Sequence, residues 1–160
     1  ESDGLFRRVA EETAKGYPEV IYNQYIVDDF ARRIVASPQE FDVVVMPNLY
    51  GDILSDAAAG TIGGLGLAPS GCYGENYAYF ESIHGTAPDI AGKHLINPTA
   101  TLLSAIMMLE YIGYTDAAAR LDHAVSQVYS DGKTLTLDQG GSASTFAFCT
   151  AVRECLGKNR

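Results

Sequence analysis

Residues 41–56 read FDVVVMPNLYGDILSD, a pattern typical of a strand followed directly by a helix. The apolar run over residues 43–46 is continuous rather than alternating, and it therefore predicts a strand buried on both faces. Pro47 ends that strand, and Tyr50 and Gly51 turn the chain into a helix of small residues. The sequence AAAG at 57–60 leaves room for another helix to approach closely, which favours a buried packing face between subunits.

Asp52 and Asp56 lie four positions apart near the start of this helix, so their carboxylates share one face. Like charges on adjacent turns repel, at a cost of roughly a few tenths of a kcal/mol. A divalent cation such as Mg²⁺ or Mn²⁺ would reverse that cost, since these ions select carboxylate oxygens. Stabilisation of both carboxylates by the helix dipole is the ordinary alternative. The pair alone leaves both interpretations open.

Composition limits the classes of function. A chain of 160 residues, 47% of them hydrophobic, can bury a core and corresponds to one domain or two small ones. A formal charge of −9 argues against a nucleic-acid or anionic-membrane partner. Cys72, Cys149 and Cys155 lack any metal-ligand spacing and indicate reduced thiols in a cytosol-like compartment. We expect neither a signal peptide nor a membrane span, because the longest apolar run is too short.

The remaining patterns predict several helices and two further strands. A glycine-rich segment at 60–71 follows a helix and lacks the spacing of a dinucleotide-binding turn, so a domain boundary or hinge is expected there. The expected helices cover residues 4–15, 27–36, 98–111, 115–130 and 144–156, and the additional strands cover 20–25 and 77–83.

The segment from residue 84 to 97 combines His84, Asp89 and Asn97 with glycines and prolines. A loop of this length is costly to order unless it holds something. The His84 ring could stack on a base, Asp89 could accept hydrogen bonds from ribose hydroxyls, and Asn97 could read an adenine edge. A loop held by its own side chains is an equally good interpretation of these residues alone.

Taken together, NLYGDILSD at 48–56, HGTAPDIAGK at 84–93 and NPT at 97–99 closely resemble the β-decarboxylating dehydrogenases. That family includes isocitrate, isopropylmalate and homoisocitrate dehydrogenases. The sequence of residues 46–50 and 63–71 looks most like that of its NAD-dependent isocitrate dehydrogenases. The resemblance implies an α/β fold of two α/β domains, of which this chain matches the C-terminal part. Residues 1–62 would belong to the small metal-binding and dimerisation domain, and 63–160 to the large cofactor-binding domain.

The resemblance also implies site residues. Asp52 and Asp56 would bind Mg²⁺ or Mn²⁺ together with Asp28, which reaches the site across a dimer interface, and Asp28 and Asp52 would have catalytic roles. Asp29 departs from the small or apolar residue expected, and one helical residue turns about 100°, so Asp28 and Asp29 cannot both face the metal. The residues implied to bind NAD are His84, Gly85, Thr86, Ala87, Asp89, Ile90 and Asn97.

The implied reaction is oxidative decarboxylation of isocitrate to 2-oxoglutarate, a step of the tricarboxylic acid cycle, with reduction of NAD. The matching enzymes place a catalytic Lys, a Tyr and most substrate-binding residues upstream of Ser2, so we expect this chain alone to be inactive. Other 2-hydroxy di- or tricarboxylic acids remain alternatives: isopropylmalate, homoisocitrate or tartrate. A non-catalytic regulatory subunit is a further alternative, against which the intact aspartates argue. We expect a homodimer or higher homo-oligomer in the cytoplasm or mitochondrial matrix.

Overall fold

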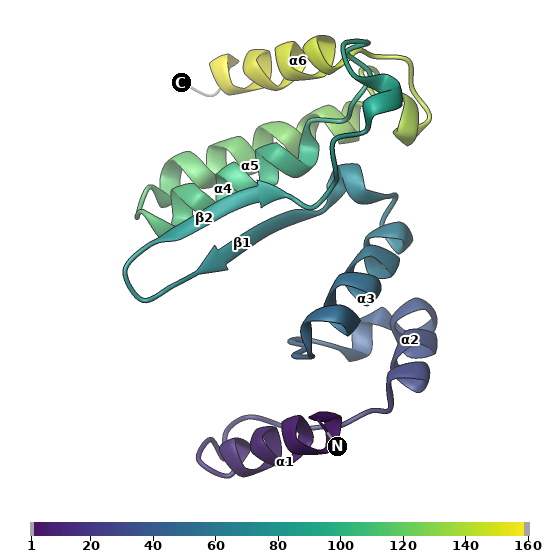
Figure 1. Cartoon of the computed structure of the whole chain (residues 1–160). Coiled ribbons are helices and arrows are strands. Elements are labelled where there is room, and N and C mark those ends of the chain that lie inside the picture. The colour runs from purple at the N-terminus through teal and green to yellow at the C-terminus, as the bar shows by residue number, and fades with distance from the viewer. Residues whose placement is uncertain (1, 159–160) are drawn as a thin grey trace. The chain divides into compact units, whose positions relative to one another are not determined.

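The computed structural model describes residues 2–158, which form two compact units (Figure 1). The first ends at Thr61 and the second begins at Ile62. The division falls inside the glycine-rich segment, where Gly63 and Gly64 both take positive φ angles that favour glycine. We describe each unit by itself.

Helices make up the regular structure of the first unit, and their positions follow the sequence pattern. The helix expected over residues 27–36 is found with those bounds, and the one expected over 4–15 begins and ends slightly earlier. Tyr50 connects two of the helices, since its hydroxyl donates to Oδ2 of Asp3 at 3.1 Å. The elements are α1 (Ser2–Ala14), α2 (Val27–Ala36), a 3-10 turn η1 (Pro38–Glu40) and α3 (Asn48–Thr61).

An aromatic cluster forms the centre of the first unit. Phe30 is buried, and its ring lies 5.0 Å from that of Phe41 in an edge-on arrangement. The ring of Tyr25 stands edge-on to Phe41 at 5.5 Å. Such pairs contribute about 0.5–1.5 kcal/mol beyond the area they bury. Leu54 of α3 is also buried, and α2 packs against α3.

The two strands expected in this unit are not formed. Residues 20–25 and 43–46 carry no strand assignment, and the exposed fractions of Ile21 (88%), Val43 (88%) and Val45 (71%) are high. The prediction of a strand at 43–46 buried on both faces is therefore wrong for this chain. The β-branched residues favour a strand, but a strand also needs neighbours for its backbone groups, and residues 2–158 supply none.

The second unit places a β-hairpin and three helices in successive contact. The strands pair antiparallel, with Pro69 opposite Ser82 and Tyr73 opposite Ala78. The hairpin packs on α4, α4 on α5 and α5 on α6 (Figure 1). The elements are η2 (Leu65–Leu67), β1 (Pro69–Tyr73), β2 (Ala78–Ser82), η3 (Pro88–Ile90), α4 (Thr99–Tyr111), α5 (Thr115–Asp131), η4 (Leu137–Gln139) and α6 (Thr145–Lys158).

These bounds confirm the strand expected near residues 77–83 and all three helices expected in this region. Strand β1 was missed, because its sequence PSGCY contains the residue types of turns. Ser104 of α4 binds both strands of the hairpin: its buried hydroxyl donates to the Glu81 carbonyl at 2.6 Å and accepts from the Ser70 N–H at 3.3 Å.

Of residues 2–158, none belongs to a helix with the length and apolar character needed to cross a bilayer.

A hydrophobic core fills the interface between α5 and α6. Phe148 has no exposed surface, and it packs with Val125, Val128 and Val152. The ring of Tyr129 meets that of Phe148 edge-on at 5.5 Å. Tyr129 thereby joins this core to a polar network at its edge.

Asn97 is the centre of that polar network, and only 3% of its surface is exposed. Its amide nitrogen donates to the Tyr129 hydroxyl at 3.2 Å and to Oδ2 of Asp138 at 2.9 Å. Its oxygen accepts from the Thr99 N–H at 3.0 Å. Asp138 in turn accepts from the Thr136 hydroxyl at 2.6 Å. The network therefore joins the ends of α4 and α5 to the segment before α6.

The ionised form of Asp138 is favoured in this network. Burial raises the pKa of Asp138, but hydrogen bonds donated by Thr136, Asn97 and Gln139 outweigh burial and hold the pKa below its ordinary value. Because the pKa is lower in the folded state, the resulting stabilisation is present above pH 4 or so and is lost as pH falls through the folded-state pKa.

We therefore predict that Asp138→Asn lowers the free energy of unfolding at pH 7 by about 1 kcal/mol, the low end for bonds to a charged group, because Asp138 is exposed. The deficit relative to the parent should shrink towards pH 3. Denaturant unfolding at both pH values measures it, and an equal deficit at both would show that the carboxylate charge contributes nothing.

A second prediction concerns Gly141, where the chain passes very close to Leu135. A Cβ built on Gly141 would clash with the backbone oxygen of Leu135, which cannot move without breaking its bond to the Ala143 N–H. Gly141→Ala should cost about 1–3 kcal/mol and lower the melting temperature. Gly157→Ala is the matched control, since nothing lies within 4 Å of its Cβ position and Ala favours a helix. Equal melting temperatures for the two variants would contradict the prediction.

Candidate metal and cofactor sites

Asp52 and Asp56 lie one turn apart on α3, and both are exposed. The helix begins at Asn48, earlier than the turn expected at Tyr50 and Gly51, so the carboxylates follow its first turn and do not lie at its very start. Within residues 2–158, neither carboxylate accepts a hydrogen bond or forms an ion pair. Two exposed carboxylates without protein partners on one helix face are suited to a cation that prefers oxygen ligands.

Asp28 lies in the first turn of α2 and is also exposed. Its Oδ1 accepts a hydrogen bond of 2.7 Å from the backbone N–H of Asp29. Residue Ile26, which precedes the helix, supplies no side-chain cap, so this bond satisfies one of the free N–H groups of the first turn. The second oxygen of Asp28 is left available to a ligand.

The three aspartates do not form a complete site within one chain. No group of three or more His, Cys, Asp or Glu residues capable of holding a metal ion occurs among residues 2–158. The family resemblance implies that Asp28 joins the other two from a partner subunit, and this stays a prediction. The donor chemistry fits Mg²⁺ or Mn²⁺, since every proposed ligand is a carboxylate.

Asp29, the residue that departs from the family pattern, is engaged in ion pairs. Its Oδ1 lies 2.7 Å from Nη2 of Arg32, and its Oδ2 lies 2.7 Å from Nε of Arg33. Hydrogen bonds from Arg33 and then Arg32 hold the pKa of Asp29 below its ordinary value, and the pKa of Arg33 is raised in return. Asp29 is therefore occupied, and Asp28 is the carboxylate that α2 presents.

The loop from residue 84 to 97 is held by its own hydrogen bonds. His84 Nδ1 lies 3.1 Å from the carbonyl of Gly85. Ala87 takes a left-handed conformation with φ 43° and leads into η3, where Asp89 is exposed at the surface. Near the other end, the Thr145 N–H donates to the His94 carbonyl at 2.8 Å. These bonds fix both ends of the loop, and Asp89 between them faces solvent.

A shallow pocket of about 250 Å³ lies along this loop. Thr86, Ala87 and Ile90 line it, whereas His84, Asp89 and Asn97 do not. The pocket is smaller than the roughly 300–1,000 Å³ typical of complete ligand sites, so it can take only part of a dinucleotide. The full lining is Thr86, Ala87, Ile90, Ala91, Gly92, His94, Leu95, Ile96 and Thr145.

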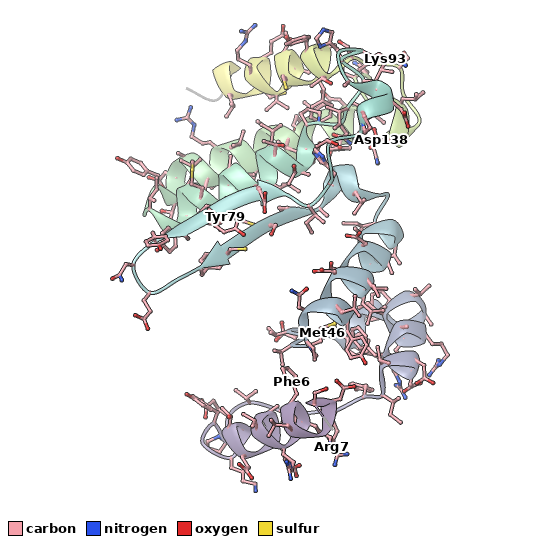
Figure 2. The ribbon with its side chains drawn as sticks, viewed as in Figure 1. Phe6, Arg7, Met46, Tyr79, Lys93 and Asp138 are labelled. Atoms are coloured by element: carbon pink, nitrogen blue, oxygen red, sulfur yellow. The ribbon has the colours of Figure 1, made fainter. Side chains whose placement is uncertain are left out.

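The side chain of Asn97 is turned into the protein, where Tyr129, Asp138 and Thr99 bind it. It could reach an adenine edge only by giving up these bonds. The cofactor contact of Asn97 stays a prediction, and it would have to come from the main chain. In Figure 2, Asp138 lies close to the loop that carries Lys93, and the Thr145–His94 bond ties that loop to the start of α6.

Sequence reasoning missed two contributors to these sites. Tyr129 was assigned only to the helix expected over residues 115–130, and Asp138 was given no role. A polar residue on the apolar face of a helix was the available signal for Tyr129. Nothing in the local pattern indicated that Asp138 would bind Asn97, which lies 41 positions earlier.

Comparison with known proteins identifies relatives of this chain. The model of the isocitrate/isopropylmalate dehydrogenase family matches residues 1–155. The chain is 53% identical to the alpha subunit of mitochondrial NAD isocitrate dehydrogenase from Homo sapiens, over 94% of this chain and 42% of that protein. It is also 53% identical to the isocitrate/homoisocitrate dehydrogenase of Thermus thermophilus, over 97% of this chain and 46% of that one.

A solved structure gives the same result. The isocitrate dehydrogenase of Methylococcus capsulatus matches with a TM-score of 0.92 and 45% identity, over 96% of this chain and 46% of that chain. The chain spans less than half the length of these relatives. The family expected from the aspartate and loop motifs is confirmed, and so is its fold: this chain belongs to the isocitrate/isopropylmalate dehydrogenase family.

Proposed function

We propose that this chain is the C-terminal half of a metal-dependent dehydrogenase that oxidises and decarboxylates isocitrate with reduction of NAD. The family is one of decarboxylating dehydrogenases. The observation that carries the proposal is the pair Asp52 and Asp56, exposed and without protein partners on one face of α3. A regulatory subunit without catalysis would have no need to keep these carboxylates, and Asp28 with them, free to bind a metal.

The metal would be held by Asp52 and Asp56 of one subunit and by Asp28 of the partner subunit. When bound, Mg²⁺ or Mn²⁺ would polarise the substrate's 2-hydroxyl and stabilise the negative charge left when CO₂ departs. Asp52 and Asp28 would help to move the hydroxyl proton away as hydride passes to the nicotinamide. This arrangement requires at least a homodimer.

NAD would bind along the loop from residue 84 to 97. The exposed carboxylate of Asp89 would accept hydrogen bonds from both hydroxyls of the adenosine ribose, and charge-assisted bonds of this kind contribute about 1.5–3 kcal/mol. The His84 ring would stack near the base, and Gly85, Thr86, Ala87 and Ile90 would shape the surface beneath the nucleotide. The names of the human and other NAD-dependent relatives support this choice of cofactor.

Isocitrate is proposed over other 2-hydroxy acids because relatives at 53% identity carry that substrate in their names. Homoisocitrate is the alternative with specific support, since the Thermus thermophilus relative is named for both substrates. Isopropylmalate and tartrate are further alternatives within the family. The compartment proposed is the cytoplasm or the mitochondrial matrix, the second because several relatives are mitochondrial.

The metal assignment predicts that Asp52→Asn in the complete protein loses several kcal/mol of transition-state stabilisation, on the order of a thousandfold in kcat at limiting metal. Loss of one anionic ligand should also raise the Mn²⁺ concentration needed for half-maximal rate. Asp122→Asn, an exposed position on α5, is the matched control and should leave both quantities unchanged. Parent-like metal dependence of Asp52→Asn would remove Asp52 from the site.

The cofactor assignment predicts a preference for NAD over NADP of about a hundredfold or more in kcat/KM. The Asp89 carboxylate would repel a 2′-phosphate, and Lys93 is the cation in the same loop that could offset this. A Lys and a Tyr at positions 89 and 90 would instead supply a cation and a hydroxyl donor to the 2′-phosphate.

The combined change Asp89→Lys and Ile90→Tyr should therefore erode or invert the preference, measured as kcat/KM for both cofactors. Asp116→Lys on α5 makes the same charge change outside the loop and should not alter the ratio. A parent enzyme that used both cofactors equally would show that Asp89 does not read the ribose.

A further inference from the structure

Two aspartates follow one another in the first turn of α2, but they have different surroundings. Asp28 accepts only the N–H of its neighbour, whereas both oxygens of Asp29 lie 2.7 Å from an arginine nitrogen. The family resemblance assigns a role to Asp28 and none to Asp29. We call Asp29, Arg32 and Arg33 the α2 clamp.

We propose that the α2 clamp is a positioning device for the metal ligand Asp28: it fixes the peptide that orients Asp28 and keeps Asp29 away from the metal. The inference rests on the proposed metal site. It concerns residues that do not themselves touch the metal, so Asp29, Arg32 and Arg33 are positioning residues rather than catalytic ones.

The clamp is anchored beyond its own helix. Nη1 of Arg33 lies 3.4 Å from Oε2 of Glu40 in η1. The guanidinium carbon of Arg33 also lies 5.3 Å from the centre of the Tyr25 ring, a cation–π distance. The Asp29 carboxylate is thus held by an arginine that is itself fixed on two further sides.

The clamp acts on Asp28 through one peptide group. The backbone N–H of Asp29 donates to Oδ1 of Asp28 at 2.7 Å, which sets the direction of the Asp28 carboxylate. Phe30, buried in the aromatic cluster, anchors the backbone of this first turn, but Ile26 offers no side-chain cap and nothing else among residues 2–158 bonds the Asp28 carboxylate. If the Asp29 side chain is released, the carboxylate of Asp28 gains freedom through the peptide that joins the two residues.

The clamp also decides how many carboxylates α2 offers to a cation. A free Asp29 would place a second carboxylate beside Asp28, and a metal ion could then bind either one or alternate between them. With Asp29 neutralised by two guanidinium groups, one carboxylate remains. Ordered contacts behind a metal ligand typically change metal affinity about 10- to 100-fold when removed.

The test uses two variants of the complete protein that change charge in opposite directions. Asp29→Asn removes a negative charge near the metal, and Arg33→Gln removes a positive one. If the clamp positions Asp28, both variants should weaken Mn²⁺ binding by about tenfold, the lower end of that range, because the pair is only half-buried. Free Mn²⁺ is measured by electron paramagnetic resonance during titration, which needs no turnover.

Simple charge effects predict something different. Without positioning, Asp29→Asn would weaken Mn²⁺ binding and Arg33→Gln would strengthen it. Opposite shifts, or no shift in either variant, would overturn the proposal. Arg120→Gln on α5, in the other unit, is the control for net charge and should bind Mn²⁺ as the parent does.

Folding and assembly are checked separately. Exposed ion pairs contribute about 0–1 kcal/mol, so the melting temperature and the dimer mass should change little in both clamp variants. Asp28→Asn distinguishes the two levels of the argument. If Asp28→Asn keeps parental Mn²⁺ affinity, the metal site of the proposed function fails and the clamp proposal fails with it. If Asp28→Asn loses affinity and the clamp variants do not, the clamp proposal alone is refuted.

Discussion

A buried amide must find partners for its N–H groups and its oxygen, and the way Asn97 meets this requirement organises the unit that begins at Ile62. Its partners Thr99, Tyr129 and Asp138 come from α4, α5 and η4, and the last two lie 32 and 41 positions after it in the chain. A buried polar group left unsatisfied costs about 1–3 kcal/mol, so these elements are held in one arrangement. The loop that begins at residue 84 ends on this fixed point.

The residues that fix the loop from residue 84 to 97 are not the residues that would contact a ligand. The end of the loop is fixed by bonds that face inward, while Asp89 in η3 faces solvent and keeps its carboxylate free for a ligand. A side chain that binds a ligand from a rigid loop loses less conformational entropy on binding than one on a mobile loop. The same division occurs on α2, where Asp29 is held by arginines and Asp28 is presented. Residue type alone therefore does not assign these roles.

How far the sequence determines the structure differs between helices and strands. The helices over residues 27–36 and 115–130 were predictable because apolar spacing and end signals are local. The strand at 43–46 was not, since pairing depends on neighbours elsewhere in sequence. The family and its aspartate and loop motifs could be recognised, but the burial of Asn97 could not, because Tyr129 and Asp138 lie 32 and 41 positions later in the chain. The pairing of Asp29 was within reach of the sequence, since Arg32 and Arg33 follow it at three and four positions on the same helix.

The first unit exposes two kinds of surface in residues 41–56, an apolar segment and a pair of carboxylates. Val43, Val44 and Val45 are apolar and exposed, although strand residues of this composition are normally covered. In the proposed metal site, Asp52 and Asp56 would supply only part of the ligand set, since an all-oxygen site needs about six ligands. The relatives are more than twice as long as this chain. In the proposed dehydrogenase, the neighbours that would cover Val43, Val44 and Val45 and those that would complete the metal site would therefore converge on the same stretch, residues 41–56.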